Sequence, residues 1–151
     1  MIAAARALLL LILANSAPWA VGRLLRGRWA WPLDGGRALR DGKPLLGSHK
    51  TWRGLISGAV VCGLVAPLTG LSWQTGAALG ALALLGDAFS SAIKRRLALL
   101  PGTDVPGLDQ LPEALLPLAA LAPALQLGVG GVVVVALLFT VLGVLMIRLR
   151  R

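Results

Sequence analysis

The sequence predicts an all-α integral membrane protein with about five transmembrane helices, an external N-terminus and a cytoplasmic C-terminus. Of its 151 residues, 57% are hydrophobic, whereas the apolar share of a soluble domain is usually about half. Stretches without charged residues run over 7–22, 54–86 and 114–147, and basic clusters separate them. We therefore expect a single multi-pass membrane domain over 1–151.

Helix-breaking residues divide these stretches into individual spans, because one span needs about 20 apolar residues. The first stretch, with its flanks, predicts one helix. Pro67, Gly70 and Ser72 divide the second stretch into two helices, and the glycines of 128–131 divide the third. The predicted helices are about 4–25, 52–70, 73–94, 110–127 and 130–149, with cytoplasmic loops about 26–51 and 95–109.

The distribution of basic residues predicts the orientation. With the first loop in the cytoplasm, 14 of the 15 basic residues lie inside, and Arg6 alone lies outside. Cytoplasmic loops of membrane proteins carry an excess of Lys and Arg, so we predict a plasma (inner) membrane protein in this orientation. Nucleic acid is not an expected partner despite the net charge of +9. The start also resembles a secretory signal, but its apolar stretch continues through Val21, which favours a retained helix.

Scarce cysteine and histidine exclude two kinds of site. Cys62 and His49 are each the only residue of their type, so neither an intrachain disulfide nor a zinc site built on His and Cys is available. All six acidic residues lie on the cytoplasmic side of the predicted topology. A bound metal must therefore use oxygen ligands, in a cytoplasmic pocket between helix ends.

Asp87 follows a long charge-free stretch, where a carboxylate costs free energy unless it is paired. On a helix, Ser90, Ser91 and Lys94 fall three, four and seven residues later, on the same face as Asp87. This face would carry an acid, two hydroxyls and a cation, which indicates a functional site. The alternative is a span that ends in a basic anchor and tolerates one acid.

The first cytoplasmic loop carries a candidate phosphate site. Ser48 or Thr51 can cap the second helix and leave backbone N–H groups free beside Lys50 and Arg53. A helix N-terminus with flanking cations favours phosphate binding. The alternative is that these cations contact lipid headgroups.

The second loop follows the basic triplet 94–96. The triplet suits a helix C-terminus, and Asp109 can cap the next helix, so a structural role stays open. Asp87 and Asp109 flanking the triplet are also what Mg²⁺ with a nucleoside triphosphate requires. Magnesium takes one or two carboxylates plus phosphate oxygens, and Lys and Arg neutralise the remaining phosphate charge.

Three of these segments, 41–54, 86–97 and 106–111, resemble the CDP-archaeol synthase family, which is related to the CDP-diacylglycerol synthases. Asn15 and Pro18 in the first helix are also similar, and the likeness runs over most of the chain in the same order. Lys-Thr-Trp-Arg-Gly, Lys-Arg-Arg-Leu and Leu-Asp-Gln are together fairly specific, whereas each alone is weak.

The resemblance implies Mg²⁺-dependent transfer of the cytidylyl group of CTP to a lipid phosphate, with release of pyrophosphate. The broader synthase pattern has a second Asp three residues after Asp109, where this chain has Pro112. Either one metal suffices, Glu113 substitutes, or activity is impaired. The implied roles are catalytic for Asp87, Lys94 and Asp109; metal-binding for Asp87 and Asp109, with Glu113 as a further candidate; and nucleotide- or phosphate-binding for Lys50, Thr51, Arg53, Ser91, Lys94, Arg95 and Arg96.

The residue chemistry fits this reaction without the family. A phosphate monoester is largely anionic near neutral pH, so it needs alignment and charge neutralisation rather than a strong base. Two other classes stay open: a small non-catalytic multi-span membrane protein, such as an anion transporter subunit or assembly partner, and a headgroup enzyme that uses a CDP-lipid. A transporter would favour polar residues at mid-membrane. A headgroup enzyme that uses a CDP-lipid would carry a repeated Asp-x-x-x-Asp, which is missing here. Ether-linked and acyl lipid tails, and a homo-oligomer, also stay open.

Overall fold

A computed structural model describes residues 1–38, 42–100 and 103–149. Two isolated β-bridges, Pro32–Thr51 and Ala38–Pro44, are formed in the first loop. The regular elements in the described residues are α1 (Ile2–Leu24), α2 (Trp52–Val65), the short 3₁₀ helix η1 (Ala66–Thr69), α3 (Trp73–Arg96), α4 (Gln110–Ala120) and α5 (Val129–Leu149). The all-α prediction is confirmed. Arg40, Asp41, Arg150 and Arg151, which the sequence assigns to the cytoplasmic side, lie outside the described residues.

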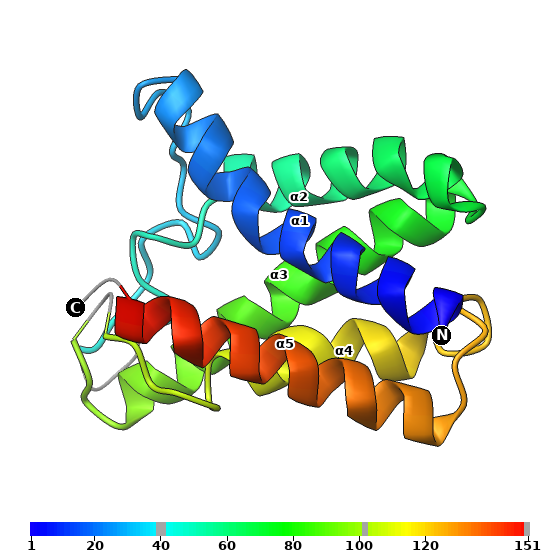
Figure 1. Cartoon of the computed structure of the whole chain (residues 1–151). Helices are drawn as coiled ribbons and strands as arrows, with labels where there is room; N and C mark the ends of the chain where they lie inside the picture. Colours follow the sequence, from blue (N-terminus) through cyan, green and yellow to red (C-terminus); the bar gives the residue numbers. More distant parts are fainter. Residues whose placement is uncertain (39–41, 101–102, 150–151) are drawn as a thin grey trace.

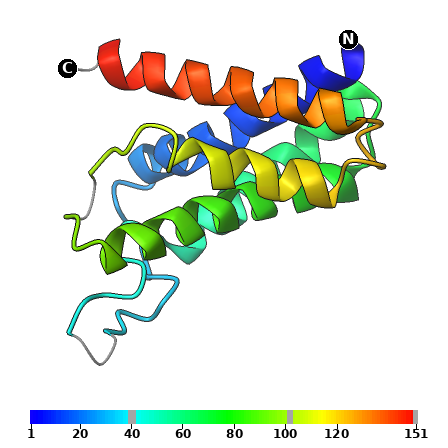
Figure 2. The same cartoon turned by 90° about the horizontal axis from the view of Figure 1, so that it is seen from below.

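The helices form a bundle with two distinct ends, and α1 crosses the others obliquely (Figure 1). The N-terminus, η1 and the loop after α4 lie at one end in both views (Figures 1 and 2). The long loop after α1, the loop after α3 and the end of α5 lie at the other. We call this second end the basic end, because the described basic residues other than Arg6 belong to it.

The bundle is built around α3, whose backbone lies directly against that of α2. A Cβ placed on Gly76 would lie 2.3 Å from the carbonyl oxygen of Cys62. A Cβ placed on Gly80 would lie 2.3 Å from the carbonyl oxygen of Gly58. Small residues four positions apart on both helices therefore permit the close approach, as is common between membrane helices.

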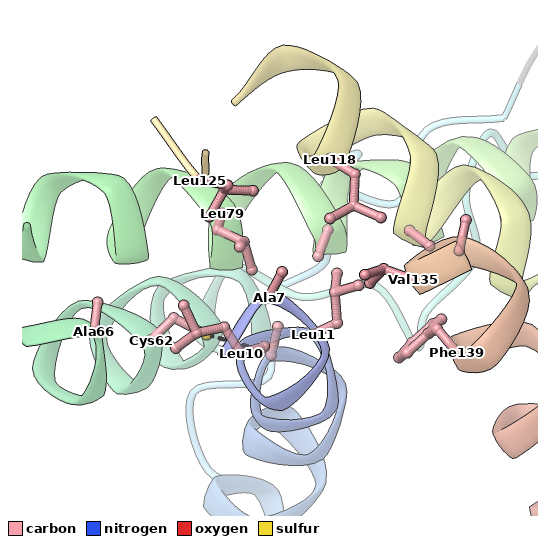
Figure 3. Packing of buried hydrophobic residues seen from close by; sticks show 14 of the residues in the cluster. Ala7, Leu10, Leu11, Cys62, Ala66, Leu79, Leu118, Leu125, Val135 and Phe139 are labelled. Carbon is pink, nitrogen blue, oxygen red and sulfur yellow. Dashed lines mark hydrogen bonds between the residues drawn. The ribbon is translucent and has the colours of Figure 1, made fainter. Parts of the chain in front are cut away.

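Apolar side chains of α1 fill the space between the remaining helices. Figure 3 shows Leu10 beside Cys62, and Leu11 beside Val135 and Phe139 of α5. The Cys62 thiol donates a hydrogen bond to the Leu10 carbonyl at 3.3 Å. The core thus ties α1 to both α2 and α5.

Four helical segments are long and apolar enough to cross a membrane: α1, α2 with η1, α3 and α5. The outer face of α5 is covered by exposed apolar side chains, a surface that water disfavours and lipid accepts. Its members include Val133, Val134, Leu137, Leu138 and Val141. Length and surface both indicate that these segments lie in a bilayer.

The fourth helix is shorter than the predicted range 110–127, because α4 ends at Ala120 after 11 residues. Pro123 disfavours helical backbone in the residue before it, and Gln126 adopts a φ of 57°. Turns replace the rest of the expected helix. The other predicted bounds agree with the structure within two residues, when η1 is counted with α2.

Arg6 of α1 holds the turns that follow α4. Its Nη2 donates to the Leu125 carbonyl at 3.2 Å and to Gln126 Oε1 at 2.8 Å. The cation that departs from the positive-inside pattern therefore has acceptors within the protein, at the end opposite to the basic end.

Candidate active site

A cavity of about 690 Å³, which we call the main cavity, lies at the basic end between α1, α3, α4, α5 and the two loops. Its charged lining consists of Lys50, Asp87, Lys94, Arg95, Asp104, Asp109 and Glu113. Its apolar lining includes Ile12 and Trp19 of α1 and Phe139, Leu142, Met146 and Ile147 of α5. The cavity thus combines a charged wall with an apolar wall.

The predicted polar face of α3 forms part of the charged wall. Asp87, Ser91 and Lys94 line the main cavity, whereas Ser90 is fully buried beside them. The hydroxyls of Ser90 and Ser91 donate to the backbone carbonyl of Asp87 at 2.8 and 3.0 Å. Both hydroxyl protons are therefore used within the helix. Asp87 and Lys94 are the charged groups of this face.

Two of the three aspartates that line the cavity, Asp87 and Asp109, each form an ion pair with a lysine. Lys50 Nζ contacts Asp87 Oδ2, and Lys94 Nζ lies 2.6 Å from Asp109 Oδ1. Lys94 also donates to the Thr103 carbonyl at 3.0 Å. Asp109 Oδ2 accepts a hydrogen bond from the Val105 amide at 2.9 Å.

Asp109 does not cap α4 through its side chain, although the sequence left that role open. The residue stands at the N-cap position, but its carboxylate makes no cap hydrogen bond to the helix. The carboxylate turns instead to Lys94 and to the loop amide of Val105. Asp109 therefore joins the second loop to α3 at the cavity wall.

Glu113 is a buried acid of the cavity, with 4% of its surface exposed. Within the described residues, its Oε1 has no hydrogen-bond partner. The first turn of α4 lies close to α3, because a Cβ placed on Gly86 would lie 2.2 Å from the Pro112 carbonyl oxygen. This close packing brings Glu113 next to Asp87. Buried polar atoms without a partner are rare in proteins, and a bound ion is one explanation for such an atom.

Arg95 is buried in the wall of the main cavity, with 4% of its surface exposed. Its Nη2 donates to the Leu100 carbonyl at 2.9 Å. Its Nε and Nη1 are buried and have no partner among the residues that the structure describes. Because a guanidinium stays charged in proteins, these N–H groups suit an anion such as a phosphate.

Two of the predicted nucleotide contacts lie elsewhere. Arg53 donates to the Arg28 carbonyl, and Arg96 Nη2 donates to the Pro44 carbonyl at 3.0 Å. Neither side chain lines the main cavity or the second cavity described below. Both arginines instead hold the first loop. Their place in the sequence did not indicate that their side chains contact loop carbonyls rather than the cavity.

Thr51 is the N-cap of α2, since the Gly54 amide donates to its Oγ1 at 3.1 Å. It confirms one of the two cap candidates and lines a second cavity of about 180 Å³. Lys50 and Asp87 line both cavities, so their ion pair stands between them. Thr51 therefore fixes the start of α2 next to that ion pair.

Asp34 is a residue that the sequence did not single out. Its buried carboxylate accepts hydrogen bonds from the amides of Gly36 and Leu46, both at 2.9 Å, and of Gly47 at 3.3 Å. Burial raises the pKa of Asp34, but the backbone donors, Leu46 first, together lower it below its ordinary value. Asp34 thus clamps the first loop shortly before Lys50. The signal in the sequence is the Asp-Gly-Gly turn.

Polar residues without charge complete the lining of the main cavity. Asn15, His49 and Gln110 belong to it, and none was assigned a role from the sequence. Gln110 Oε1 accepts a hydrogen bond from the Gly107 amide at 2.8 Å. Asn15 was detectable as a polar residue inside an apolar span.

The acids of the cavity suit a hard divalent cation by donor type, because they offer carboxylate oxygens and Glu113 has an oxygen without a partner. Within the ranges that the structure describes, no group of three His, Cys, Asp or Glu side chains converges closely enough to hold a metal ion. The lysines contact Asp87 and Asp109 directly. The donor chemistry therefore fits a metal, while lysines neutralise the aspartates in this state.

Comparison with known proteins identifies relatives along most of the chain. The CDP-archaeol synthase of Thermococcus kodakarensis is 40% identical over 131 residues, covering 80% of this chain and 73% of that protein. Those of Pyrococcus furiosus and Hyperthermus butylicus are 37% and 38% identical, over 64% and 65% of this chain. The matches cover 60% and 59% of these two relatives' own lengths.

A solved structure of an intramembrane enzyme for archaeal membrane lipids biosynthesis is also similar, at 30% identity and a TM-score of 0.78. The match covers 93% of this chain and 90% of that one. With the apolar helices described above, it makes this chain a membrane protein. The family described as CarS-like CDP-archaeol synthase matches residues 2–76 and 72–149. The chain therefore belongs to the CDP-archaeol synthase family.

Proposed function

We propose that this protein is a CTP:lipid-phosphate cytidylyltransferase that forms a CDP-activated lipid and pyrophosphate. The observation that carries the proposal is the main cavity, whose lining combines charged side chains with apolar side chains of α1 and α5. The charged wall suits a triphosphate and a lipid phosphate. The apolar wall, with Phe139, Leu142 and Met146 of α5, suits the first carbons of a lipid chain.

Arg95 is the first phosphate contact of the proposed site. Its Nε and Nη1 are buried without a partner in the described residues, and the residue lines a cavity that holds other cations. Lys94 stands one residue before it on the same wall and has a flexible stem. Together they hold the triphosphate by charge-assisted hydrogen bonds. For Thr51, Arg53 and Arg96 we propose an indirect role, which is to hold the loop that carries Lys50.

Mg²⁺ is the metal that we propose for this site, held by Asp87 and Asp109, with Glu113 as a further ligand. When bound, the cation neutralises phosphate charge and makes the α-phosphorus a better electrophile. The unpartnered Oε1 of Glu113 supports the option in which Glu113 substitutes for the acid that Pro112 displaces.

The reaction needs little proton transfer from the protein. An oxygen of the lipid phosphate, already largely anionic near neutral pH, forms the new bond to the α-phosphorus of CTP. The bond between the α-phosphorus and the bridging oxygen breaks, and pyrophosphate leaves. The cavity residues align the two phosphates and neutralise their charge.

Labelled CTP tests this proposal directly. We expect the purified protein, given Mg²⁺ and a panel of lipid phosphates, to transfer label to lipid and to release pyrophosphate. The relatives are named CDP-archaeol synthases, so we expect ether-linked isoprenoid phosphates to be better acceptors than acyl phosphates. The non-catalytic alternative predicts that label stays in CTP with every lipid, and that result would overturn the proposal.

Arg95→Ala is expected to raise the KM for CTP strongly. Loss of a buried charge-assisted contact to phosphate costs about 1.5–3 kcal/mol, or roughly 10- to 150-fold. Arg37→Ala is the matched control, because Arg37 is exposed in the first loop and lines neither cavity. Initial rates over a CTP titration measure both variants. An unchanged KM in Arg95→Ala would assign this arginine a purely structural role.

The active site is proposed to face the cytoplasm, across a plasma (inner) membrane. A reporter fused after Arg151 is expected to give a cytoplasmic signal, and one inserted at Ser72 an external signal. The reason is that the basic loops lie at the end of the bundle opposite to the start of α3 (Figure 1), and Ser72 directly precedes α3. A cytoplasmic signal at Ser72 would contradict the proposed orientation.

A further inference from the structure

Asp87 and Asp109 of the main cavity already have cationic partners within the protein. Lys50 contacts Asp87, and Lys94 lies 2.6 Å from Asp109. The pairs come from different elements, since Lys50 precedes α2 while Lys94 stands in the last turn of α3. Both ion pairs are largely shielded, with side chains 21% and 26% exposed in the first and 9% and 15% in the second.

A third acid shares this environment without a hydrogen bond at one oxygen. Glu113 is buried, lines the same cavity and interacts electrostatically with Asp87, Lys50 and Asp109. Its Oε1 has no partner within the described residues. The cavity therefore offers a ligand oxygen beside two carboxylates that lysines neutralise.

Entry of a divalent cation alone is unfavourable in this arrangement. The cation would have to displace an ammonium from Asp87 or Asp109, and that ammonium would remain in a shielded cavity without a counter-ion. Leaving a charge unpaired in such surroundings is costly. A triphosphate changes the balance, because its oxygens give the displaced ammonium a new anionic partner.

We propose that Lys50 and Lys94 are exchangeable counter-ions, so that metal and nucleotide occupy this site only together. In the free protein the lysines neutralise Asp87 and Asp109. When the nucleotide binds with its cation, the flexible lysine stems turn to the phosphates and release the carboxylates. Arg95 stays in place, since the Leu100 carbonyl holds it. The inference rests on the proposed function for the identity of the nucleotide.

Binding of Mn²⁺, read from the electron paramagnetic resonance signal of the free ion, tests the exchange without any turnover. The protein in detergent is titrated with Mn²⁺ alone, and with Mn²⁺ and CTP in the absence of lipid phosphate. A titration of Mn²⁺ and CTP without protein corrects for the ion that CTP itself binds. We expect CTP to tighten Mn²⁺ binding by the wild-type protein at least about tenfold, the scale of coupling between charges in contact. Equal Mn²⁺ affinity with and without CTP would overturn the proposal.

The lysine variants provide the second arm. Lys50→Met and Lys94→Met are each expected to bind Mn²⁺ alone at least about tenfold more tightly than the wild type, because one carboxylate loses its competing cation. Lys43→Met is the matched control, since Lys43 lies in the first loop and lines neither cavity, and it should keep the wild-type affinity. If the folded Lys50→Met and Lys94→Met proteins bind Mn²⁺ no more tightly than the wild type, the exchange is contradicted.

Two further comparisons keep the outcomes distinct. Lys50→Arg retains a cation at Asp87 and is expected to bind Mn²⁺ alone as weakly as the wild type. If gel filtration shows that a methionine variant does not fold, the exchange is tested by the wild-type protein alone, through its Mn²⁺ affinity with and without CTP. Mn²⁺ that binds together with CTP in a protein that transfers no label would refute the proposed activity and leave the exchange standing. Tight binding of Mn²⁺ alone by a protein that transfers label would refute the exchange and leave the proposed activity standing.

Discussion

Asp87→Asn and Asp109→Asn are each expected to reduce cytidylyl transfer by at least about a hundredfold, the scale on which loss of one preorganised electrostatic group acts. Each change removes a negative charge from the wall that carries the proposed metal, while the amide keeps the volume of the side chain. The measurement is the initial rate at saturating CTP and Mg²⁺, with gel filtration and circular dichroism to establish folding.

Asp104→Asn is the comparison for this pair, because it removes the same charge from the third aspartate of the cavity lining, which is an exposed residue of the second loop. Asp104 forms no ion pair in the structure's described part, so we expect a much smaller loss. Full activity in either folded Asp87 or Asp109 variant would contradict the proposed metal site. A shifted Mg²⁺ requirement in Glu113→Gln would add Glu113 to that site.

Gly86→Ala is expected to reduce stability and activity together. The added methyl would lie 2.2 Å from the Pro112 carbonyl oxygen and 2.9 Å from the Glu113 Cα, so α4 has to move away from α3. Overpacking of this kind costs about 1–3 kcal/mol, and the movement separates Glu113 from Asp87. Thermal unfolding in detergent measures the first effect, and the Mg²⁺ dependence of the rate measures the second.

Gly130→Ala is the control for Gly86→Ala, with the opposite sign expected. Gly130 lies in α5 with open space where a Cβ would stand. Alanine favours helical backbone over glycine by up to about 1 kcal/mol. We expect a slight stabilisation and an unchanged rate. If Gly86→Ala matched Gly130→Ala in both measurements, the close packing of α3 and α4 would not matter for the site.

The helices of this protein were predictable because charge and helix breakers mark their limits. Long charge-free stretches, with Ser72 and the glycines near 130 as breaks, gave bounds close to those observed. The end of α4 was not predictable from hydrophobicity, since the chain stays apolar to Leu125. There the backbone preferences around Pro123 decide the structure.

The site was predictable where residues share one helix face, as Asp87, Ser91 and Lys94 do on α3. Contacts between elements were not, because they depend on how the helices pack. The partner of Asp87 is Lys50, which lies 37 residues earlier in the chain. Arg53 lies three residues after Lys50, yet it donates to the Arg28 carbonyl and does not line the cavity. Lys50 precedes α2, so the two side chains share no helix face.

The hydrogen bonds of Arg6 have a consequence for the order in which the protein is made. They join positions 119 and 120 residues apart, between the first helix and the turns after α4. Because synthesis proceeds from the N-terminus, α1 leaves the ribosome long before its acceptors at Leu125 and Gln126 exist. During that interval the guanidinium depends on water and lipid headgroups. The end of the bundle that holds the N-terminus is therefore completed late in biogenesis, after the loop between α4 and α5 has emerged.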